Sequence, residues 1–333
     1  MRRGVFWLLL ILLVAALALA LAVGPYPLRL ADVTHTVMRA LGLEAGLSTP
    51  GEIAFGRVRL PRVVAGLVVG AALSGAGAAY QTLFRNPLVS PDILGVATGA
   101  GLGAVVGILL SLPVAGIQVL AFAGGLATVA VVYLIAAALR GHDRTLVLVL
   151  GGVVVGALAG ACISLVKIMA DPYDQLPAIT FWLLGSLAAV KMSDLAVAAP
   201  LVVAGLVPLV LYRWRVGVLS LGDDEARALG VDVGRLRGLV IAAATLMTAS
   251  VVAIAGVVGW IGLMIPHIAR MLIGPNFARL LPASMLLGAA FMLVVDTAAR
   301  SMARVETPLG ILTAVLGAPF FLWLLARGKK TWG

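Results

Sequence analysis

The 333-residue sequence has little charge: only 11% of its residues are Asp, Glu, Lys or Arg, whereas soluble domains have about 25%. It also lacks the polar composition of disordered chains, because 62% of its residues are hydrophobic and its mean hydropathy is +1.14. A membrane-spanning helix needs about 20 apolar residues, and several continuous runs approach that length. Their continuity excludes a β-barrel, whose strands alternate apolar and polar residues. The composition predicts a polytopic all-α membrane protein.

Cysteine and acidic residues are also scarce. The single cysteine, Cys162, cannot form an intrachain disulfide and says nothing about the redox compartment. Against 24 Lys and Arg stand only 14 Asp and Glu, which gives a net charge of +10. In a soluble protein this excess would suggest nucleic-acid binding. Here the basic residues lie in short loops between apolar runs, so the positive-inside rule explains them better, and we expect no nucleic-acid partner.

The start of the chain imitates a signal peptide, because two arginines precede an apolar run that extends to Val23. Cleaved signal peptides usually have an apolar region of about 7–15 residues. This run is longer, and the rest of the chain is apolar as well. We therefore expect an uncleaved first span.

Gaps between charges predict ten spans and one half-helix in a single transmembrane domain, residues 1–333. The predicted spans are residues 5–23, 63–84, 93–110, 115–139, 146–169, 195–212, 238–257, 260–272, 280–299 and 308–326, with the half-helix at 178–190. Residues 24–62 form a predicted external loop, and residues 213–237 a long loop on the opposite side. Threaded in this way, 15 Lys and Arg share the side of both termini and nine lie opposite, so both termini are predicted to be cytoplasmic.

Two predicted spans carry a glycine at every fourth position. Lipid provides no hydrophobic drive between helices, so small residues that let backbones approach hold such bundles together. The two ridges indicate either tight packing or smooth faces that slide or line a path for cargo. The glycines are Gly95, Gly99, Gly103 and Gly107 in one span, and Gly152, Gly156 and Gly160 in the other.

The long cytoplasmic loop contains a segment, Leu221 to Gly230, that is predicted to form a short helix. Asp223 can cap its first turn, and Asp224 and Glu225 suit the positive end of the helix dipole. Gly230 is placed to end the helix. A capped helix in such a loop is either a stabilised connector or a docking element.

Several arginines lie at the predicted outer ends of spans, where the positive-inside rule expects few. Headgroup anchoring explains such residues in many membrane proteins, but a cationic outer face can also capture an acidic ligand or protein partner. Asp296 lies inside a predicted span and is a functional candidate by default, with an ion pair to Arg300 as the alternative. The outer arginines are Arg57, Arg59, Arg62, Arg300 and Arg304.

Signals of catalysis are absent from the sequence. No segment has the G-x-x-x-x-G-K-[ST] pattern of a nucleotide-binding loop. The three histidines, His35, His142 and His267, lack the carboxylate or cysteine spacing of a metal site. The sequence predicts neither an active site nor a bound metal.

Separated motifs in a fixed order resemble the permease subunits of type II ATP-binding-cassette (ABC) importers, which serve iron–siderophore, haem and cobalamin uptake. The resemblance covers nearly the whole chain from Arg59 onward. Trp260 and Thr307 depart mildly from it, since Phe and an aliphatic residue are expected there. The matching segments are Arg59–Arg62; Ser74–Ala76 with Gln81; Phe84–Leu88 with Pro91 and Leu94–Val96; Trp182 with Gly185–Ser186; Leu221–Gly222, Ala226–Arg227 and Leu229–Val231; Gly259 with Ile261–Leu263 and Pro266–Arg270; Asp296, Arg300, Glu306, Pro308 and Gly310; and Gly317–Pro319.

The resemblance implies a homodimer of ten-span subunits in the cytoplasmic (inner) membrane of a bacterium or archaeon, with the cargo path along the dimer axis. It also implies two cytoplasmic ATPase subunits, which bind ATP and Mg²⁺, and a periplasmic or lipid-anchored substrate-binding protein. This chain itself is then no enzyme and binds no cofactor. Arg59, Arg62 and Arg300 match positions that pair with acidic residues of the binding protein.

The resemblance also implies how ATP drives transport. Thr145 and Leu146 lie near the family's cytoplasmic gate, and Gln81 and Asn86 are further candidates for the path or gate. The implied mechanism is alternating access, in which closure of the ATPase subunits rotates the spans. The residues implied in ATPase coupling are Leu221, Gly222, Asp223, Glu225, Ala226, Arg227, Leu229 and Gly230.

The cargo stays open at this point. Iron–siderophore or haem is favoured by family frequency, and cobalamin or molybdate are alternatives, because the donor protein makes the selection. An ion-coupled secondary transporter, a different class, needs paired intramembrane charges, and only Asp296 is a candidate. A membrane-embedded enzyme needs a polar catalytic cluster, which the sequence does not show.

Overall fold

The computed structural model describes residues 2–24, 26–43, 49–139, 144–303 and 305–327. All regular structure within these ranges is helical. Seven of the described helices are long and apolar enough to cross a membrane, and four further apolar helices are shorter. The prediction of an all-α polytopic membrane protein is confirmed.

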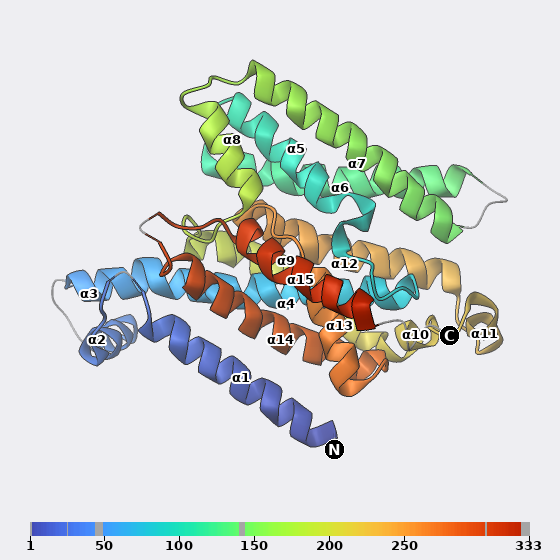
Figure 1. Ribbon diagram of the computed structural model, residues 1–333, viewed down its shortest axis with the longest axis horizontal. Coiled ribbons are helices and arrows are strands. Elements are labelled where there is room, and N and C mark those ends of the chain that lie inside the picture. The colour runs from blue at the N-terminus through green and yellow to red at the C-terminus, as the bar shows by residue number, and fades with distance from the viewer. Residues whose placement is uncertain (1, 25, 44–48, 140–143, 304, 328–333) are drawn as a thin grey trace.

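The helices of the apolar body follow the predicted order, with ends that differ by a few residues. Successive crossing helices run in opposite directions, so α1 begins and α15 ends toward the same end of the molecule (Figure 1). In chain order the helices are α1 (Arg2–Ala22), α4 (Leu60–Leu83), α5 (Val96–Leu109), α6 (Val114–Ala138), α7 (Arg144–Met169), the half-helix α8 (Gln175–Leu184), α9 (Met192–Leu211), α12 (Val233–Ala255), α13 (Ile261–Ile273), α14 (Phe277–Ala299) and α15 (Leu309–Arg327).

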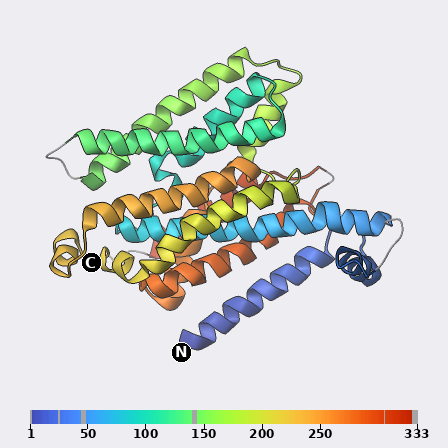
Figure 2. The same cartoon turned by 180° about the vertical axis from the view of Figure 1, so that it is seen from behind.

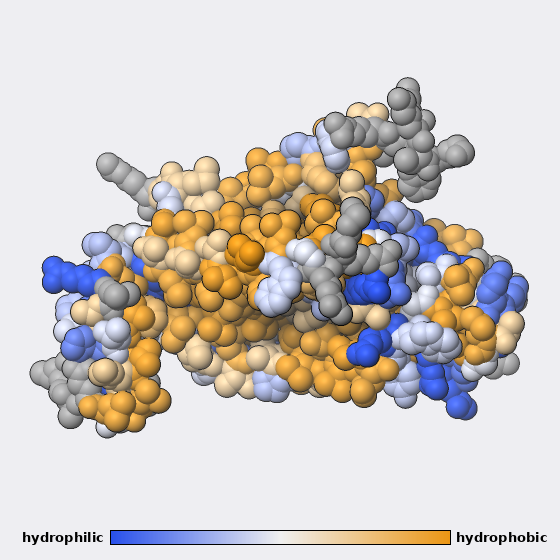
Figure 3. Space-filling model, turned by 90° about the horizontal axis from the view of Figure 1, so that it is seen from below, coloured by the Kyte–Doolittle hydropathy of each residue, from blue (hydrophilic) through white to orange (hydrophobic). Residues whose placement is uncertain are grey.

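Polar side chains gather at the two ends of the long axis, and apolar side chains cover the middle of the face in Figure 3. One polar end, the α2 end, carries α2 (Leu30–Ala40), α3 (Pro50–Ile53) and the π-helix η1 (Ala54–Arg59). The other, the α11 end, carries α10 (Arg213–Val218) and α11 (Asp223–Ala228). An apolar band between polar ends is the surface that a bilayer requires.

Helix α4 is the central helix of the larger layer, where it contacts α9, α12, α13 and α14. Its small residues explain this position, because they let neighbouring backbones approach closely. A Cβ atom on Gly77 would meet the carbonyl oxygen of Gly262 on α13, and one on Gly70 would meet that of Gly288 on α14. This close packing along its length makes α4 rigid between its two ends.

Helices α5 to α8 form a second layer beside this core (Figures 1 and 2). The glycine ridge of α5 packs onto α6, since a Cβ atom on Gly99 would meet the carbonyl oxygen of Gly124. Tight packing is therefore the correct interpretation of this ridge. The ridge of α7 is divided, because a Cβ atom on Gly152 would meet the carbonyl oxygen of Ile93, whereas Cβ atoms on Gly156 and Gly160 would meet open space.

The predicted external loop 24–62 contains helices that the charge-gap criterion missed. Thr49 caps α3 by accepting a hydrogen bond from the backbone N–H of Glu52 at 3.2 Å, and Pro50 occupies the first turn. This Thr-Pro-x-Glu pattern is a helix-start signal. Runs without charge locate only the segments inside the hydrocarbon. Helices outside it contain charged residues and are indicated by their capping residues instead. For the same reason, the predicted loop 213–237 contains α10, α11 and the first turn of α12.

The half-helix is shifted toward the N-terminus from its predicted position. It begins at Gln175 because Pro177 fits within a first helical turn, where no intrahelical N–H is needed. It ends at Leu184 because Gly185 takes a left-handed φ of 72°. A Cβ atom on Gly185 would also approach the carbonyl oxygen of Val257, so glycine is required there twice over.

Candidate functional site

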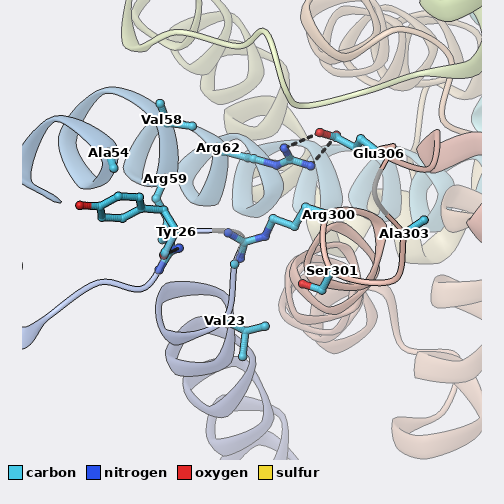
Figure 4. A pocket seen from close by; sticks show the side chains of 11 residues that line it. Val23, Tyr26, Ala54, Val58, Arg59, Arg62, Arg300, Ser301, Ala303 and Glu306 are labelled. Atoms are coloured by element: carbon cyan, nitrogen blue, oxygen red, sulfur yellow. Dashed lines mark hydrogen bonds and ion pairs between the residues drawn. The ribbon is translucent and has the colours of Figure 1, made fainter. Parts of the chain in front are cut away.

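Arginines and carboxylates from three segments meet at the α2 end, beside a cavity of about 650 Å³ (Figure 4). Arg59 closes η1 and Arg62 lies in the first turn of α4. Asp296 and Arg300 lie at the end of α14, and Glu306 lies in the linker to α15. The three predicted docking arginines are therefore brought together, and all three line the cavity. Their exposed fractions are 5%, 6% and 8% in chain order.

Two carboxylates hold Arg62. Its Nε donates to both oxygens of Asp296 at 2.8 and 3.0 Å, and its terminal nitrogens donate to Glu306 at 2.9 and 2.6 Å. Asp296 is therefore ion-paired, chiefly with Arg62. The predicted pair with Arg300 is present but longer, at 3.7 Å between Nε and Oδ2. Removing one member of such a buried pair costs about 3–5 kcal/mol, because the other charge stays buried.

Arg59 and Arg300 hold the end of α1. Arg59 donates to the carbonyl oxygens of Leu21 at 2.7 Å and Tyr26 at 2.6 Å, and Arg300 donates to that of Ala20. The last carbonyls of a helix lack intrahelical partners and carry the negative end of its dipole, which suits a guanidinium. Both arginines thus stabilise the fold as well as shape the cavity.

The cavity wall is electropositive. Three guanidinium groups face two carboxylates, and Arg59 contacts no carboxylate within the described residues. Burial lowers the pKa of the Arg300 guanidinium, and the neighbouring Asp296 carboxylate opposes this shift. Arg57 is exposed on η1 and does not line the cavity. Arg304 lies outside the described residues, as does His142.

Asp223 fixes α11 at the opposite end of the molecule. Its carboxylate accepts hydrogen bonds from Nη2 of Arg237 on α12 at 2.9 and 3.2 Å, and lies 3.5 Å from Nη2 of Arg85, which follows α4. The predicted capping role of Asp223 is wrong, because Gly222 is the N-cap. The predicted helix end is correct, since α11 stops before Gly230, whose φ is 77°.

The outer face of α11 is open to a partner. Ala226 is fully buried and anchors the helix, whereas Leu221 and Leu229 are 60% and 51% exposed. Glu225 and Arg227 are exposed between them. This segment lines a polar cavity of about 610 Å³ together with Arg85, Thr145 and Arg237. The predicted coupling residues therefore divide into a buried anchor and an exposed contact face.

The four predicted path or gate residues lie in different environments. Thr145 lines the polar cavity at the start of α7, and Leu146 is 55% exposed beside it. Gln81 is 1% exposed, and its amide nitrogen donates to the carbonyl oxygens of Val89 at 3.3 Å and Leu263 at 2.9 Å. The side chain of Asn86 accepts from the N–H of Leu88 at 2.9 Å. Gln81 and Asn86 thus brace the turn after α4 within the subunit.

The sequence predicts no role for Glu306, Arg85 or Arg237. Counting the charges at the outer end could have identified Glu306. The three arginines there carry more positive charge than Asp296 alone can balance. Arg85 and Arg237 had no comparable signal, since their shared partner Asp223 is 14 residues from Arg237 and far from Arg85 in sequence.

Comparison with known proteins agrees with this geometry. Residues 11–327 match the FecCD transport family. The "Probable iron chelatin transport system permease protein" of Helicobacter pylori is 42% identical over 82% of both chains. The molybdate import system permease protein MolB of Haemophilus influenzae is 38% identical over 97% of this chain and 95% of that one.

A solved structure described as a metal-chelate type ABC transporter, in an inward-facing conformation, has a TM-score of 0.87 to this chain. It is 36% identical and covers 98% of this chain and 99% of its own. Since both the sequence and the arrangement of helices agree over almost the full length, the chain belongs to the FecCD transport family and is an ABC transporter permease.

Proposed function

We propose that this permease is the membrane subunit of an ATP-driven importer that moves a metal chelate across the cytoplasmic membrane by alternating access. One observation carries the proposal: α4 joins the arginine cluster at the α2 end to the Arg85–Asp223 ion pair at the α11 end. Arg62 lies in the first turn of α4, and Arg85 lies two residues after the end of the helix. A single packed helix therefore connects a surface suited to a donor protein with a surface suited to an ATPase.

The charge distribution supports the orientation. The α11 end carries the greater share of Lys and Arg, so the positive-inside rule places it, with both termini, in the cytoplasm. The α2 end then faces outward, where a periplasmic or lipid-anchored substrate-binding protein docks its acidic residues on Arg59, Arg62 and Arg300. Two partner ATPase subunits bind ATP and Mg²⁺ and contact the exposed face of α11. Thr145 and Leu146, beside α11, contribute to the cytoplasmic gate.

An iron chelate, as a siderophore complex or haem, is the proposed cargo, with cobalamin or molybdate as alternatives. The two relatives above are named for an iron chelate and for molybdate at similar identity, so overall similarity does not select the cargo. An ion-coupled secondary transporter is less well supported, because the intramembrane acid Asp296 is held by Arg62 rather than free to carry an ion.

The test is uptake by the complete transporter in liposomes, assembled from this chain, the ATPase and the binding protein of the same transporter. Ferric siderophores, haem, cobalamin and molybdate are offered in turn. We expect one loaded binding protein to stimulate ATP hydrolysis and its cargo to accumulate. We also expect Arg59→Glu to weaken docking at least about tenfold, because it places like charges together. Uptake that follows an ion gradient without ATP would reject the proposal.

Arg29→Glu is the matched control for this variant. Arg29 is an exposed arginine at the same end, at the start of α2, and does not line the cavity. If both reversals weaken docking equally, general charge rather than the arginine cluster attracts the donor, and the docking assignment is wrong.

The exposed face of α7 supports a homodimer. Gly156 and Gly160 lie about one turn apart on the same side of the helix, and a Cβ atom on either would meet open space, so a second helix can approach this side closely. Figure 1 shows α7 at the outer edge of the second layer. Helices associate in lipid through such packing faces, so a second copy of α7 is the proposed partner.

A cysteine at position 160 tests this dimer. In a Cys162→Ser background, Gly160→Cys is expected to give a covalent dimer on oxidation in membranes, because two-fold symmetry brings the same face of both copies together. Leu134→Cys, on the exposed side of α6 at 66% exposure, is the control and should stay monomeric. Equal crosslinking of the two variants would show random collision and would argue against an α7 interface.

A further inference from the structure

We infer that Glu306 occupies the docking arginine Arg62 in the unbound permease, so that an acidic side chain of the arriving binding protein must displace it. The inference rests on the proposed docking function and adds an internal competitor to it. Displacement of Glu306 would then transmit the docking event to the start of α15.

The two carboxylates on Arg62 differ in a way that suits this role. Asp296 binds Nε from within α14 and is 1% exposed, so nothing from outside can reach it. Glu306 binds the two terminal nitrogens, is 30% exposed and lines the cavity. Figure 4 shows its carboxylate facing the guanidinium of Arg62 at the cavity wall. An incoming carboxylate can therefore replace Glu306 but not Asp296.

Charge favours such an exchange. The cluster has one guanidinium more than it has carboxylates, so a third carboxylate is attracted to it. A bidentate carboxylate–guanidinium pair is a strong interaction with defined geometry, and one such pair can replace another without leaving Arg62 unpaired. The competitor therefore tunes affinity while Asp296 holds Arg62 in place.

Glu306 also links the end of α8 to the start of α15. Its carboxylate accepts a hydrogen bond from Oγ of Ser186, which follows α8, at 3.3 Å. The N–H of Leu309, the first residue of α15, donates to the carbonyl oxygen of Gly185 at 3.0 Å. Displacing Glu306 would free this linker and pass the docking event to α15 and α8.

The experiment measures the affinity of the cognate substrate-binding protein for the complete transporter in nanodiscs. Glu306→Gln removes the charge but keeps the size and the capacity for hydrogen bonding. We expect it to tighten docking about fivefold, the effect of a partly exposed ion pair. We also expect a higher ATPase rate without the binding protein. Ser186→Ala, which removes the hydroxyl contacts to Glu306 and to the N–H of Ala188, should act in the same direction and more weakly.

Asp174→Asn is the matched control, because Asp174 is an exposed acid before α8 that does not line the cavity. It removes one negative charge without touching Arg62. If Glu306→Gln and Asp174→Asn change affinity equally, or if Glu306→Gln weakens docking, the competitor inference is overturned. The docking proposal is judged separately: it stands if Arg59→Glu weakens docking at least about tenfold and fails if that variant binds normally. Melting temperatures of all variants identify any that fold poorly, and Ser186→Ala then decides the outcome.

Discussion

Replacing Asp223 with alanine is expected to uncouple the transporter: cargo uptake falls at least about tenfold while the partner subunits continue to hydrolyse ATP. Asp223 holds α11 against Arg237, whose side chain is 7% exposed, and against Arg85 at the end of α4. Leaving a buried guanidinium without its carboxylate costs about 2–3 kcal/mol. That energy corresponds to a roughly 30- to 150-fold loss of the docked position of α11.

Asp224→Ala is the control for this prediction. Asp224 is the next residue on the same helix and carries the same charge, but it is 95% exposed and pairs with Arg227, three residues further along the chain. Such a surface pair contributes about 0–1 kcal/mol, so uptake should change less than about fivefold. Uptake and ATP hydrolysis are measured together in liposomes. If the two variants behave alike, the ion pairs of Asp223 do not transmit the ATPase motion.

Replacing Gly77 with alanine is expected to destabilise the permease more than any other glycine-to-alanine substitution on α4. The added Cβ atom would lie against the carbonyl oxygen of Gly262, a backbone atom of α13 that cannot move without shifting the helix. Overpacking of this kind costs about 1–3 kcal/mol or more. We expect a clear fall in melting temperature in detergent and poor recovery of a monodisperse protein.

Gly75→Ala is the matched control, two residues away on the same helix. Its Cβ atom would meet the flexible ends of Met285 and Met247, at 3.2 and 3.3 Å, which can adjust. Alanine also favours the helix by up to about 1 kcal/mol relative to glycine. The melting temperature of this variant should therefore stay near that of the parent. Equal melting temperatures for Gly75→Ala and Gly77→Ala would show that α4 and α13 are not in backbone contact.

Both predictions concern α4, whose two ends carry the outer and inner ion pairs. The helix has few ways to absorb a movement at one end, because small residues seat it against α13 and α14 along its length. A displacement at Arg62 is therefore expected to shift the whole helix and so to move Arg85. Asp223 then determines whether α11 follows that shift.

The membrane fold follows from the sequence alone. Charges cannot remain in the hydrocarbon at low free energy, so the gaps between them located the crossing helices to within a few residues. The same constraint, through the basic loops, predicted which end is cytoplasmic. The separated motifs were sufficient to indicate the family, because their order along the chain does not depend on knowing which segments meet in space.

Only the tertiary structure decided which charged groups are partners. Arg62 and Glu306 are 244 residues apart, and nothing local distinguishes Glu306 from any other acid in a linker. The position of Asp223 at the start of the predicted helix suggested a capping role, whereas the fold brings Arg237 and Arg85 to its carboxylate and Gly222 is the N-cap. Similarly, Gly99 packs against α6 while Gly156 faces open space, although both belong to the same four-residue pattern. The residue types determine the local backbone conformation and the boundaries of the membrane-spanning segments. Which side chains become partners depends on distances that exist only once the helices have packed together.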